Sequence, residues 1–536
     1  MTRTTCCLGI GVLALALYVA LGALNLKWGD LNQDEGWYLY GARLVKEGRV
    51  PYRDFAFTQG PVMPYVYAHA QSWVDRWGVA GGRLVTGLLG LGGALWAALL
   101  AGRMAPRDQR AAAVALALVL IAGNVYQSYF TTVVKTYSLC IFFLVAGWWA
   151  LSYAAGRMKW AAAFAAGVAL ALAAGTRLSA GAAMPVAGVY LLAKRQQIGD
   201  GAWVAFGLGG ALGLAVLSVP FWLSAKEGFL FGMFEYHSGR SAGGWLPALV
   251  FKAGFISRVV QAYFWPLVLT LAVAVLRWMA PVEPQPLPSS RGVPGGFSAA
   301  VWIGVLAITL THLAAPFPYD DYQAIAFPLL AAALAAALVR YLAETIADPE
   351  KARAWFGWLM AVVFLGSVAS AFSSPINQDW KVLGRDRIWW RLKPQPSLQL
   401  LHELGLWLGN ETAFGDVLLT QDTYLAVEAG AHVPPGMELG PFCYFPDMPT
   451  ERARTLRVLN RELMLELLRT TPATQAAFSG YGLVIRGPEV LPLAEEERSE
   501  LMEALGGRFD ELFQVPDFGQ GHTTLRVYRA REAEAK

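Results

Sequence analysis

The chain has 536 residues, of which 56% are hydrophobic and only 15% are charged, whereas roughly 25% of the residues in an ordinary soluble domain are charged. The mean hydropathy of +0.41 excludes an ordinary soluble enzyme. The net charge of +4 is read as a topology signal, because an excess of Lys and Arg in a membrane protein usually comes from cytoplasmic loops. We therefore expect a lipid bilayer, and no nucleic acid, as a partner.

Apolar blocks recur along the chain from Thr5 to Phe372 and then stop. A helix needs about 20 mainly apolar residues to cross a bilayer, and runs of this kind indicate about eleven spans. The predicted spans are Thr5–Leu26, Gly81–Ala101, Ala111–Tyr126, Thr136–Ala154, Trp160–Gly175, Leu178–Leu192, Ala202–Ser224, Val259–Met279, Ala299–Leu313, Ala324–Leu342 and Phe356–Phe372. The sequence thus predicts an α-helical polytopic membrane protein, although the shorter segments leave open a kinked or re-entrant pair.

Lys and Arg gather in alternate connections between these spans, as they do in cytoplasmic loops. The connections hold Arg103, Arg107 and Arg110; Arg157 and Lys159; Lys194 and Arg195; Arg277 and Arg291; and Arg340, Lys351 and Arg353. This alternation places the N-terminus in the cytoplasm and the residues after Phe372 outside. We expect a multi-pass protein of a prokaryotic inner (plasma) membrane, with a first outer loop at residues 27–80.

The composition changes after residue 372, where the apolar blocks give way to ordinary charge density. Short β-type runs at Val417–Leu419, Leu483–Ile485 and Thr524–Tyr528 alternate with helical runs at Glu451–Leu468 and Ala494–Leu505, a pattern typical of a small α/β domain. We therefore divide the chain into a transmembrane domain at residues 1–372 and an extracytoplasmic domain at residues 373–536.

The first outer loop opens with adjacent carboxylates, Asp34 and Glu35. The residues that follow have helical spacing, with Trp37 and Tyr40 on one face, which predicts an amphipathic helix on the membrane surface. Asp34 would lie at the N-terminus of this helix, where the macrodipole favours an ionised carboxylate. Gly48 would end it, and a second surface helix is expected at Val62–Trp77. From the residues alone, Asp34 as a helix cap and Glu35 as its solvated neighbour remain open.

The acidic pair in D-E-G-W-Y, the following A-R-L-V-K-E-G and the Gly/Pro-punctuated return, together with the predicted topology, resemble the GT-C membrane glycosyltransferases. The chain is most similar to the bacterial branch related to protein O-mannosyltransferases and to the aminoarabinose transferase of lipid A. The resemblance implies a GT-C fold with about 11 transmembrane helices and a small C-terminal α/β extracytoplasmic domain.

Members of that superfamily transfer a sugar from a polyprenyl-phosphate carrier to an acceptor on the outer face of the membrane. The resemblance implies the same for this chain, with a cell-envelope glycan, lipid or protein as acceptor and an inverting mechanism. By position, Asp34 is the expected catalytic base and Glu35 a supporting carboxylate. The base would take the proton of the acceptor hydroxyl, which contributes about 10²–10⁴-fold, while cations would stabilise the departing phosphate.

Several further polar residues are expected on the outer side and are predicted to bind substrate. Arg177 is the expected phosphate clamp, although a snorkelling interfacial arginine is open, and Tyr319 and Tyr322 are expected to line a sugar or isoprenoid groove, although an aromatic belt is open. The remaining candidates are Gln59, Tyr40, Lys135, His237 and Arg240.

No cofactor is required by this reading. In the aminoarabinose-transferase type, a charged or histidine residue commonly precedes the Pro of the first-loop return, whereas this chain has Thr58-Gln59-Gly60-Pro61. We therefore assign no metal ligands. A divalent ion gathered by Asp34, His237 and Asp320 is left open, but no spacing rule supports it.

Two other classes of membrane protein compete with a transferase. A transporter would usually carry ionisable residues at the middle of its spans, whereas here nearly all lie at the ends. A polysaccharide polymerase or ligase would not explain the acidic first-loop helix. The W-W-D signature of oligosaccharyltransferases is missing, because Trp148-Trp149 is followed by Ala and Trp389-Trp390 by Arg.

Overall fold

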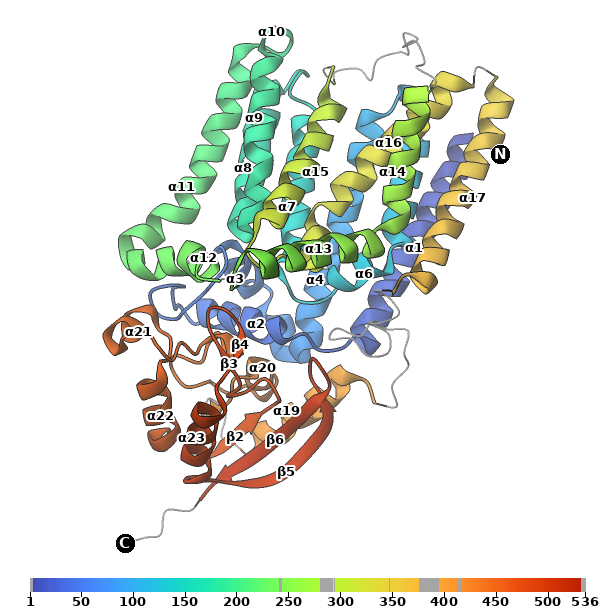
Figure 1. The fold of residues 1–536 in the computed structure, drawn as a ribbon. Coiled ribbons are helices and arrows are strands. Elements are labelled where there is room, and N and C mark those ends of the chain that lie inside the picture. The colour runs from blue at the N-terminus through green and yellow to red at the C-terminus, as the bar shows by residue number, and fades with distance from the viewer. Residues whose placement is uncertain are drawn as a thin grey trace.

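The structure is a computed structural model, and it describes residues 3–240, 243–279, 293, 295–346, 348–375, 395–411 and 416–531. The described residues form two layers (Figure 1): a bundle of long helices running side by side, and a mixed α/β region beneath one end of the bundle. The N-terminus lies at the other end of the bundle from this C-terminal region. The two are therefore separated as the predicted topology expects, while the side that faces the cytoplasm stays a prediction.

The bundle is that of a multi-pass membrane protein. Among the described residues, seven helices are long and apolar enough to cross a membrane, or eight if one bent pair counts as a single span. These helices are α1 (Arg3–Trp28), α4 (Gln71–Met104), α8 (Lys159–Thr176), α11 (Asp200–Leu230), α15 (Phe297–Ala314), α16 (Phe327–Thr345) and α17 (Pro349–Ser373), and the bent pair is α13 (Trp245–Ala262) with α14 (Phe264–Met279).

Each of the predicted spans falls on helical structure, but the count of about eleven is not confirmed. Three of the segments form helices shorter than a full span. They are α5 (Arg110–Ala122), α7 (Thr136–Leu151), and η2 (Leu178–Ala182) continued by α9 (Ala183–Ala193). Helices α5 and α7 are buried along most of their length, so their apolar character comes from the interior of the bundle as much as from lipid, whereas most residues of η2 and α9 are partly or fully exposed.

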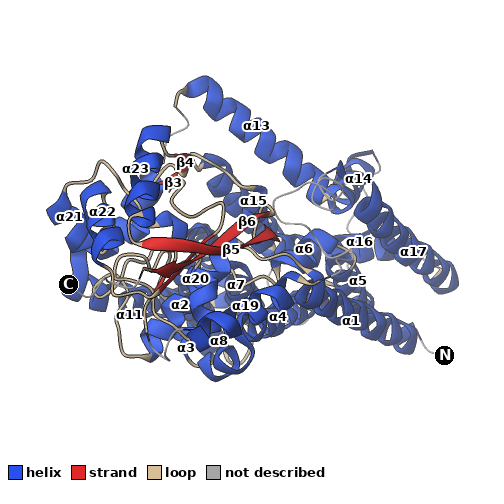
Figure 2. Ribbon diagram, turned by 90° about the horizontal axis from the view of Figure 1, so that it is seen from below, coloured by secondary structure: helices blue, strands red, loops and turns tan. Residues whose placement is uncertain are grey.

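The predicted span Val259–Met279 is wrong at its start. The chain bends by 87° between α13 and α14, and α13 lies across the other helices (Figure 1) along an edge of the molecule (Figure 2). The bend follows from Pro266 in the first turn of α14, because a proline ring would clash with the carbonyl of Ala262, four residues earlier, and ends the preceding helix there.

The first loop lies between the two layers. It contains α2 (Gln33–Lys46) and α3 (Val62–Ala68). Asn32, and not Asp34, caps α2, in a capping box with Glu35. Gly48 follows the end of the helix with φ +87°, where the sequence predicted that the helix ends. The prediction that α2 is an amphipathic helix lying on the membrane surface is wrong, because most of its residues are buried. The C-terminal region packs against it so closely that a Cβ at Gly36 would lie 2.4 Å from the Tyr424 amide nitrogen.

The predicted surface helix Val62–Trp77 is divided. Helix α3 ends at Ala68, and α4 begins at Gln71 and kinks at Gly78, where φ is +57°. The kink leaves the amide of Val79 without its helical partner, and Glu428 Oε1 accepts a hydrogen bond from it at 2.8 Å. A side chain of the C-terminal region therefore caps the spanning part of α4.

The C-terminal region is the small α/β unit expected from the sequence. Its main sheet has the strand order β1-β2-β6-β5, with β1 and β2 parallel and the other pairs antiparallel, and β3 pairs with β4 in a separate ribbon. The strands are β1 (Leu418–Leu419), β2 (Gln475–Phe478), β3 (Ile485–Arg486), β4 (Leu491–Pro492), β5 (Phe509–Phe518) and β6 (Thr523–Ala530). Its helices are α19 (Ser397–Glu411), α20 (Thr423–Ala429), α21 (Thr450–Leu456), α22 (Arg461–Thr470) and α23 (Glu495–Gly506).

The predicted helix Glu451–Leu468 is two helices, because Arg457 adopts φ +59° after α21 and Asn460 caps α22 through the amide of Leu463. The other described elements are short. They are α6 (Val125–Phe130), α10 (Arg195–Ile198), α12 (Tyr236–Ser238), and the turns η1 (Arg107–Gln109), η3 (Phe231–Glu235), η4 (Asp320–Ile325) and η5 (Gly440–Phe442).

Candidate active site

A cleft with a volume of about 140 Å³ opens where α2, the ends of several bundle helices and the C-terminal region meet. It brings together most of the residues predicted from the sequence to act on substrate. These are Asp34, Gln59, Lys135, Arg177, His237, Arg240, Tyr319 and Tyr322. Residues that are far apart in the chain therefore form one polar and aromatic surface, and the remaining two candidates, Glu35 and Tyr40, lie outside its lining.

Asp34 lies in the first turn of α2, and its side chain is 27% exposed. Its amide donates to Asn32 Oδ1, and its Oδ1 accepts from Trp37 Nε1 at 3.3 Å. Asn32 caps the helix, which leaves the carboxylate of Asp34 free to face the cleft. The carboxylate thus lies at the positive end of the helix dipole and at the edge of the cleft, where a general base can reach an acceptor hydroxyl.

Lys135 is the charge nearest to Asp34. Its side chain is 6% exposed, and its ammonium lies 3.1 Å from Asp34 Oδ2 and 2.9 Å from Asp321 Oδ2. Asp321 also accepts a hydrogen bond from Tyr137 at 2.8 Å. A buried ammonium must be paired, and here it bridges a cleft carboxylate and a buried one. Asp321 was not among the predicted site residues, and nothing local in the sequence shows that η4 meets the start of α7.

Arg177 follows the last residue of α8, and its guanidinium is sandwiched between aromatic rings. Its Cζ lies 4.2 Å from the Tyr322 ring centroid and 5.0 Å from that of Tyr137, and Nη1 donates to Thr136 Oγ1 at 3.2 Å. Its Nε is buried and has no hydrogen-bond partner among the described residues. The rings hold the planar cation by cation–π contact, which leaves donor capacity for an anion.

His237 lies in α12, which follows α11 through η3, and Arg240 lies just after the end of α12. Arg240 donates to the Tyr236 hydroxyl at 3.1 Å and to the Pro488 carbonyl at 3.2 Å. His237 Nε2 donates to the carbonyl of Thr58 at 2.8 Å, which ties α12 to the first-loop return beside Gln59. The cleft thus has a third cation, and its histidine is used to hold the first loop.

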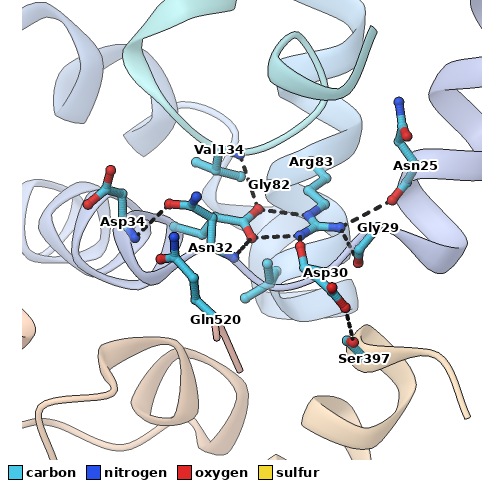
Figure 3. Close-up of polar contacts among 12 residues, drawn as sticks. Asn25, Gly29, Asp30, Asn32, Asp34, Gly82, Arg83, Val134, Ser397 and Gln520 are labelled. Atoms are coloured by element: carbon cyan, nitrogen blue, oxygen red, sulfur yellow. Dashed lines mark hydrogen bonds and ion pairs between the residues drawn. The ribbon is translucent and has the colours of Figure 1, made fainter. Parts of the chain in front are cut away.

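Glu35 lies outside the cleft lining, fully buried, in an ion pair with Arg83. The guanidinium of Arg83 is labelled in Figure 3, with its contacts to Asn25, Gly29 and Asp30. Arg83 Nε and Nη2 each lie 2.7 Å from a carboxylate oxygen, and the guanidinium also donates to the carbonyls of Asn25, Gly29 and Asp30. This is a bidentate ion pair, in which two N–H groups of the guanidinium donate to the two oxygens of the carboxylate. Glu35 is therefore buried away from the cleft, where it can position other residues but substrate cannot reach it.

The same carboxylate connects two parts of the site. Glu35 accepts hydrogen bonds from the amide of Asn32 at 2.9 Å and from that of Val134 at 3.1 Å. Asn32 caps the helix that carries Asp34, and Val134 immediately precedes Lys135. The buried side chain of Glu35 therefore fixes the position of Asp34 relative to Lys135. Sequence reasoning missed Arg83, which lies in an apolar stretch of α4 and looks like a boundary charge.

Tyr40 lies on the other side of α2. Its hydroxyl accepts a hydrogen bond from the amide of Val433 at 3.0 Å, and its ring lies against His432. It therefore joins α2 to the C-terminal region. The residues considered for a metal also have other partners, since Asp320 is bound by Tyr126 and Arg258. The described part of the chain contains no group of three or more His, Cys, Asp or Glu side chains that could hold a metal ion.

Similarity to solved structures extends along the whole chain. The structure of ArnT from Cupriavidus metallidurans bound to undecaprenyl phosphate matches with a TM-score of 0.57 and 14% identity, over 98% of this chain and 98% of that one. The apo structure of the same protein matches with a TM-score of 0.57 and 15% identity, over 96% and 97%. The chain has the GT-C fold. The resemblance seen in the first loop is thereby confirmed for the fold, while no family model and no curated protein matches the sequence.

Proposed function

We propose that this chain is a membrane glycosyltransferase that transfers a sugar from a polyprenyl-phosphate donor to a cell-envelope acceptor, with inversion at the anomeric carbon. The observation that carries the proposal is the cleft, in which the helix-terminal carboxylate of Asp34 faces Lys135 and shares one lining with Arg177 and Arg240. A base beside a cluster of cations is what the attack of a hydroxyl on a phosphate-linked sugar needs. The GT-C fold, which is also that of a protein bound to undecaprenyl phosphate, supports it.

In this mechanism the acceptor oxygen forms a bond to the anomeric carbon as the bond between that carbon and the phosphate oxygen breaks. The acceptor proton passes to the carboxylate of Asp34, and the bonding electrons leave with the lipid phosphate. Lys135, Arg177 and Arg240 stabilise the charge on the departing phosphate, and their held positions avoid reorganisation during the reaction. The phosphate takes over part of the pairing that Lys135 has with Asp34, which leaves the base available to the acceptor.

The membrane arrangement follows from the same proposal. Residues 1–372 form the transmembrane domain and residues 373–536 the extracytoplasmic domain, with the N-terminus in the cytoplasm of a prokaryotic inner membrane. The donor's isoprenoid tail stays in the bilayer, and its phosphate and sugar reach the cleft at the end of the bundle. Positive residues in the alternate loops support this orientation.

The test is transfer of radiolabelled sugar from undecaprenyl-phosphate donors, in a panel of pentoses and hexoses, to membrane acceptors. The wild type is compared with Asp34→Asn and, as a matched control, with Asp75→Asn, an exposed carboxylate on α4. We expect Asp34→Asn to lose at least 10²-fold in rate, as removal of a general base does, and Asp75→Asn to keep wild-type activity. Equal transfer rates for wild type and Asp34→Asn would show that Asp34 is not the catalytic base.

A further inference from the structure

The C-terminal region supplies part of the cleft. Five of its residues line it, and we call them the C-terminal wall: Phe442, Tyr481, Ile485, Val490 and Gln520. They come from η5, from strand β3 and the loops next to it, and from the turn between β5 and β6. The region therefore does more than cover the bundle, since it forms one side of the space in which Asp34 lies.

The wall is tied to the helix that carries the base. The buried carboxylate of Asp422 accepts hydrogen bonds from the amide and the hydroxyl of Ser479 at 2.6 and 2.7 Å, and from Gln33 Nε2 at 2.9 Å. Ser479 Oγ in turn accepts from the amide of Tyr481. Because Gln33 immediately precedes Asp34, one carboxylate sets the position of Tyr481 relative to the base.

A second connection runs through the β5–β6 turn. Gln520 Oε1 accepts a hydrogen bond from the amide of Gln33 at 2.9 Å, and His522 Nε2 lies 3.0 Å from the buried Asp30 Oδ2. On the opposite side of the cleft, Arg240 donates to the carbonyl of Pro488. The wall is therefore held at both of its ends by residues of the bundle and first loop.

The wall also contains a backbone conformation that its sequence does not favour. Within the wall, Val490 has φ +60°. Leu483, which lies between the wall residues Tyr481 and Ile485, has φ +55°. A β-branched residue in the left-handed region is an outlier, which persists only where the surrounding structure enforces it. Such positions gather at binding sites, and Val490 is at the same time a residue that lines the cleft.

The charges of the cleft are divided between its two sides. Lys135, Arg177 and Arg240 all come from the bundle side, whereas the C-terminal residues that line the described cleft are two aromatic, two aliphatic and one carboxamide side chain. A lipid-linked phosphate therefore finds its counter-charges on the bundle side, which is also where its isoprenoid tail must remain. The uncharged wall is left for the other substrate.

We propose that the C-terminal wall binds the acceptor, and that the acceptor presents an uncharged sugar ring. This inference rests on the proposed transferase function and names the substrate class of its second subsite. An aromatic ring such as that of Tyr481 packs against the apolar face of a sugar, and a carboxamide such as Gln520 can hydrogen-bond hydroxyl groups without requiring charge. A phosphorylated acceptor would meet no counter-charge among the five described residues of the wall.

The test uses the full-length protein in nanodiscs and p-nitrophenyl glycosides of glucose, galactose and mannose as neutral probes, with their 6-phosphates as charged probes. Binding is measured by saturation-transfer NMR titration on wild type, Tyr481→Ala, Tyr481→Phe and Val490→Gly. Leu491→Ala is the matched control, because Leu491 neighbours Val490 but is 48% exposed. Folding of each variant is checked by its thermal transition.

We expect a neutral glycoside to bind, Tyr481→Ala to weaken it about tenfold, and Tyr481→Phe and Leu491→Ala to remain within twofold of wild type. Val490→Gly should weaken binding while its thermal transition stays equal or rises, because glycine relieves the left-handed strain; a residue with only a structural role would not separate the two. Tighter binding of the 6-phosphates, or unchanged binding in Tyr481→Ala and Val490→Gly, overturns the proposal.

Transfer measured on the same preparations separates this inference from the proposed function. If glycoside binding depends on the wall residues but the wild type transfers no sugar from any donor, the proposed acceptor site is supported and the proposed transferase function is contradicted. If transfer depends on Asp34 but the acceptor KM of the wall variants stays within twofold of wild type, the transferase function is supported and the role of the wall in acceptor binding is contradicted.

Discussion

The ammonium of Lys135 lies 3.1 Å from the carboxylate of Asp34, so the proposed base and its nearest cation form one unit. Replacing Lys135 by Met removes the positive charge and leaves Asp321 buried without its ion-pair partner. We expect the transfer rate to fall by roughly 10²–10³-fold, the range found when a single preorganised donor is lost from a transition state. The measurement is kcat and donor KM for transfer from the undecaprenyl-phosphate donor.

Lys135→Arg serves as the comparison for that variant, since it keeps the charge but changes the shape of the donor group. It should retain more activity than Lys135→Met. Because the interaction with the leaving phosphate grows in the transition state, kcat should fall more than donor KM rises. A Met variant that loses only donor affinity would contradict a role for Lys135 in the transition state.

Arg177 is expected to act on the donor through its planar shape as well as its charge. The guanidinium lies on the ring of Tyr322 with its Nε buried, so a lysine cannot reproduce either contact. We expect both Arg177→Ala and Arg177→Lys to raise donor KM by about tenfold or more, whereas Tyr322→Phe, which keeps the ring, should stay near wild type. A lysine variant with wild-type donor KM would show that charge alone suffices.

The buried pair of Glu35 and Arg83 should matter for stability. Removing one partner of such a pair costs about 3–5 kcal/mol, because the other charge is left uncompensated in the interior. Arg83→Met should therefore be strongly destabilised, and Glu35→Gln less so, since Arg83 keeps its carbonyl partners. The double variant should lose less than the sum of the two single ones. The free energy of unfolding of each variant is measured in detergent, with heat or a denaturant used to unfold the protein.

A surface pair provides the reference for these variants. Arg461 and Glu500 have side chains that are 57% and 34% exposed, and exposed pairs contribute about 0–1 kcal/mol. Arg461→Met should accordingly change stability little. If Arg83→Met lost no more than this control, the ion pair behind the cleft would not be what holds the first loop in register.

The sequence predicts those parts of the fold and site that depend on local patterns. Apolar runs located the long helices of the bundle other than α13, and the acidic pair followed by a helical pattern located α2 with Asp34 in its first turn. The bend between α13 and α14 was missed although Pro266 signals it, because an apolar run continues through the break. The split between α21 and α22 was missed because the left-handed conformation of Arg457 has no signature in its side chain.

Pairings over long distances in the chain could not be predicted. Asp321 meets Lys135, and Arg83 meets Glu35, only after helices from different parts of the sequence pack together. A single sequence shows a charge at a helix end but not its partner. For the same reason Glu35 was predicted beside the substrate, whereas the packing of α4 against α2 turns it into the interior.

Glu438 should make stability depend on pH. This carboxyl is 5% exposed, and its burial raises its pKa to about 7, against the smaller opposing effects of hydrogen bonds from backbone amides and of Arg49 and Arg457. Because the folded chain binds this proton more tightly than the unfolded chain, stability falls as the pH rises from the usual glutamate pKa of about 4.3 to the folded value, and the loss is then complete. At about 1.4 kcal/mol per pKa unit, the loss is roughly 4 kcal/mol.

Glu438→Gln removes the titrating group but keeps an acceptor for the amide of Gly436, which Glu438 Oε2 holds at 2.7 Å. The variant should be more stable than wild type at pH 8 and should lose the advantage at pH 5, where the wild-type carboxyl is protonated. Thermal transitions of both proteins across this range provide the measurement, and Glu503→Gln, on the exposed side of α23, is the control. A difference between wild type and Glu438→Gln that stays constant from pH 5 to pH 8 would mean that this carboxyl keeps its ordinary pKa in the folded chain.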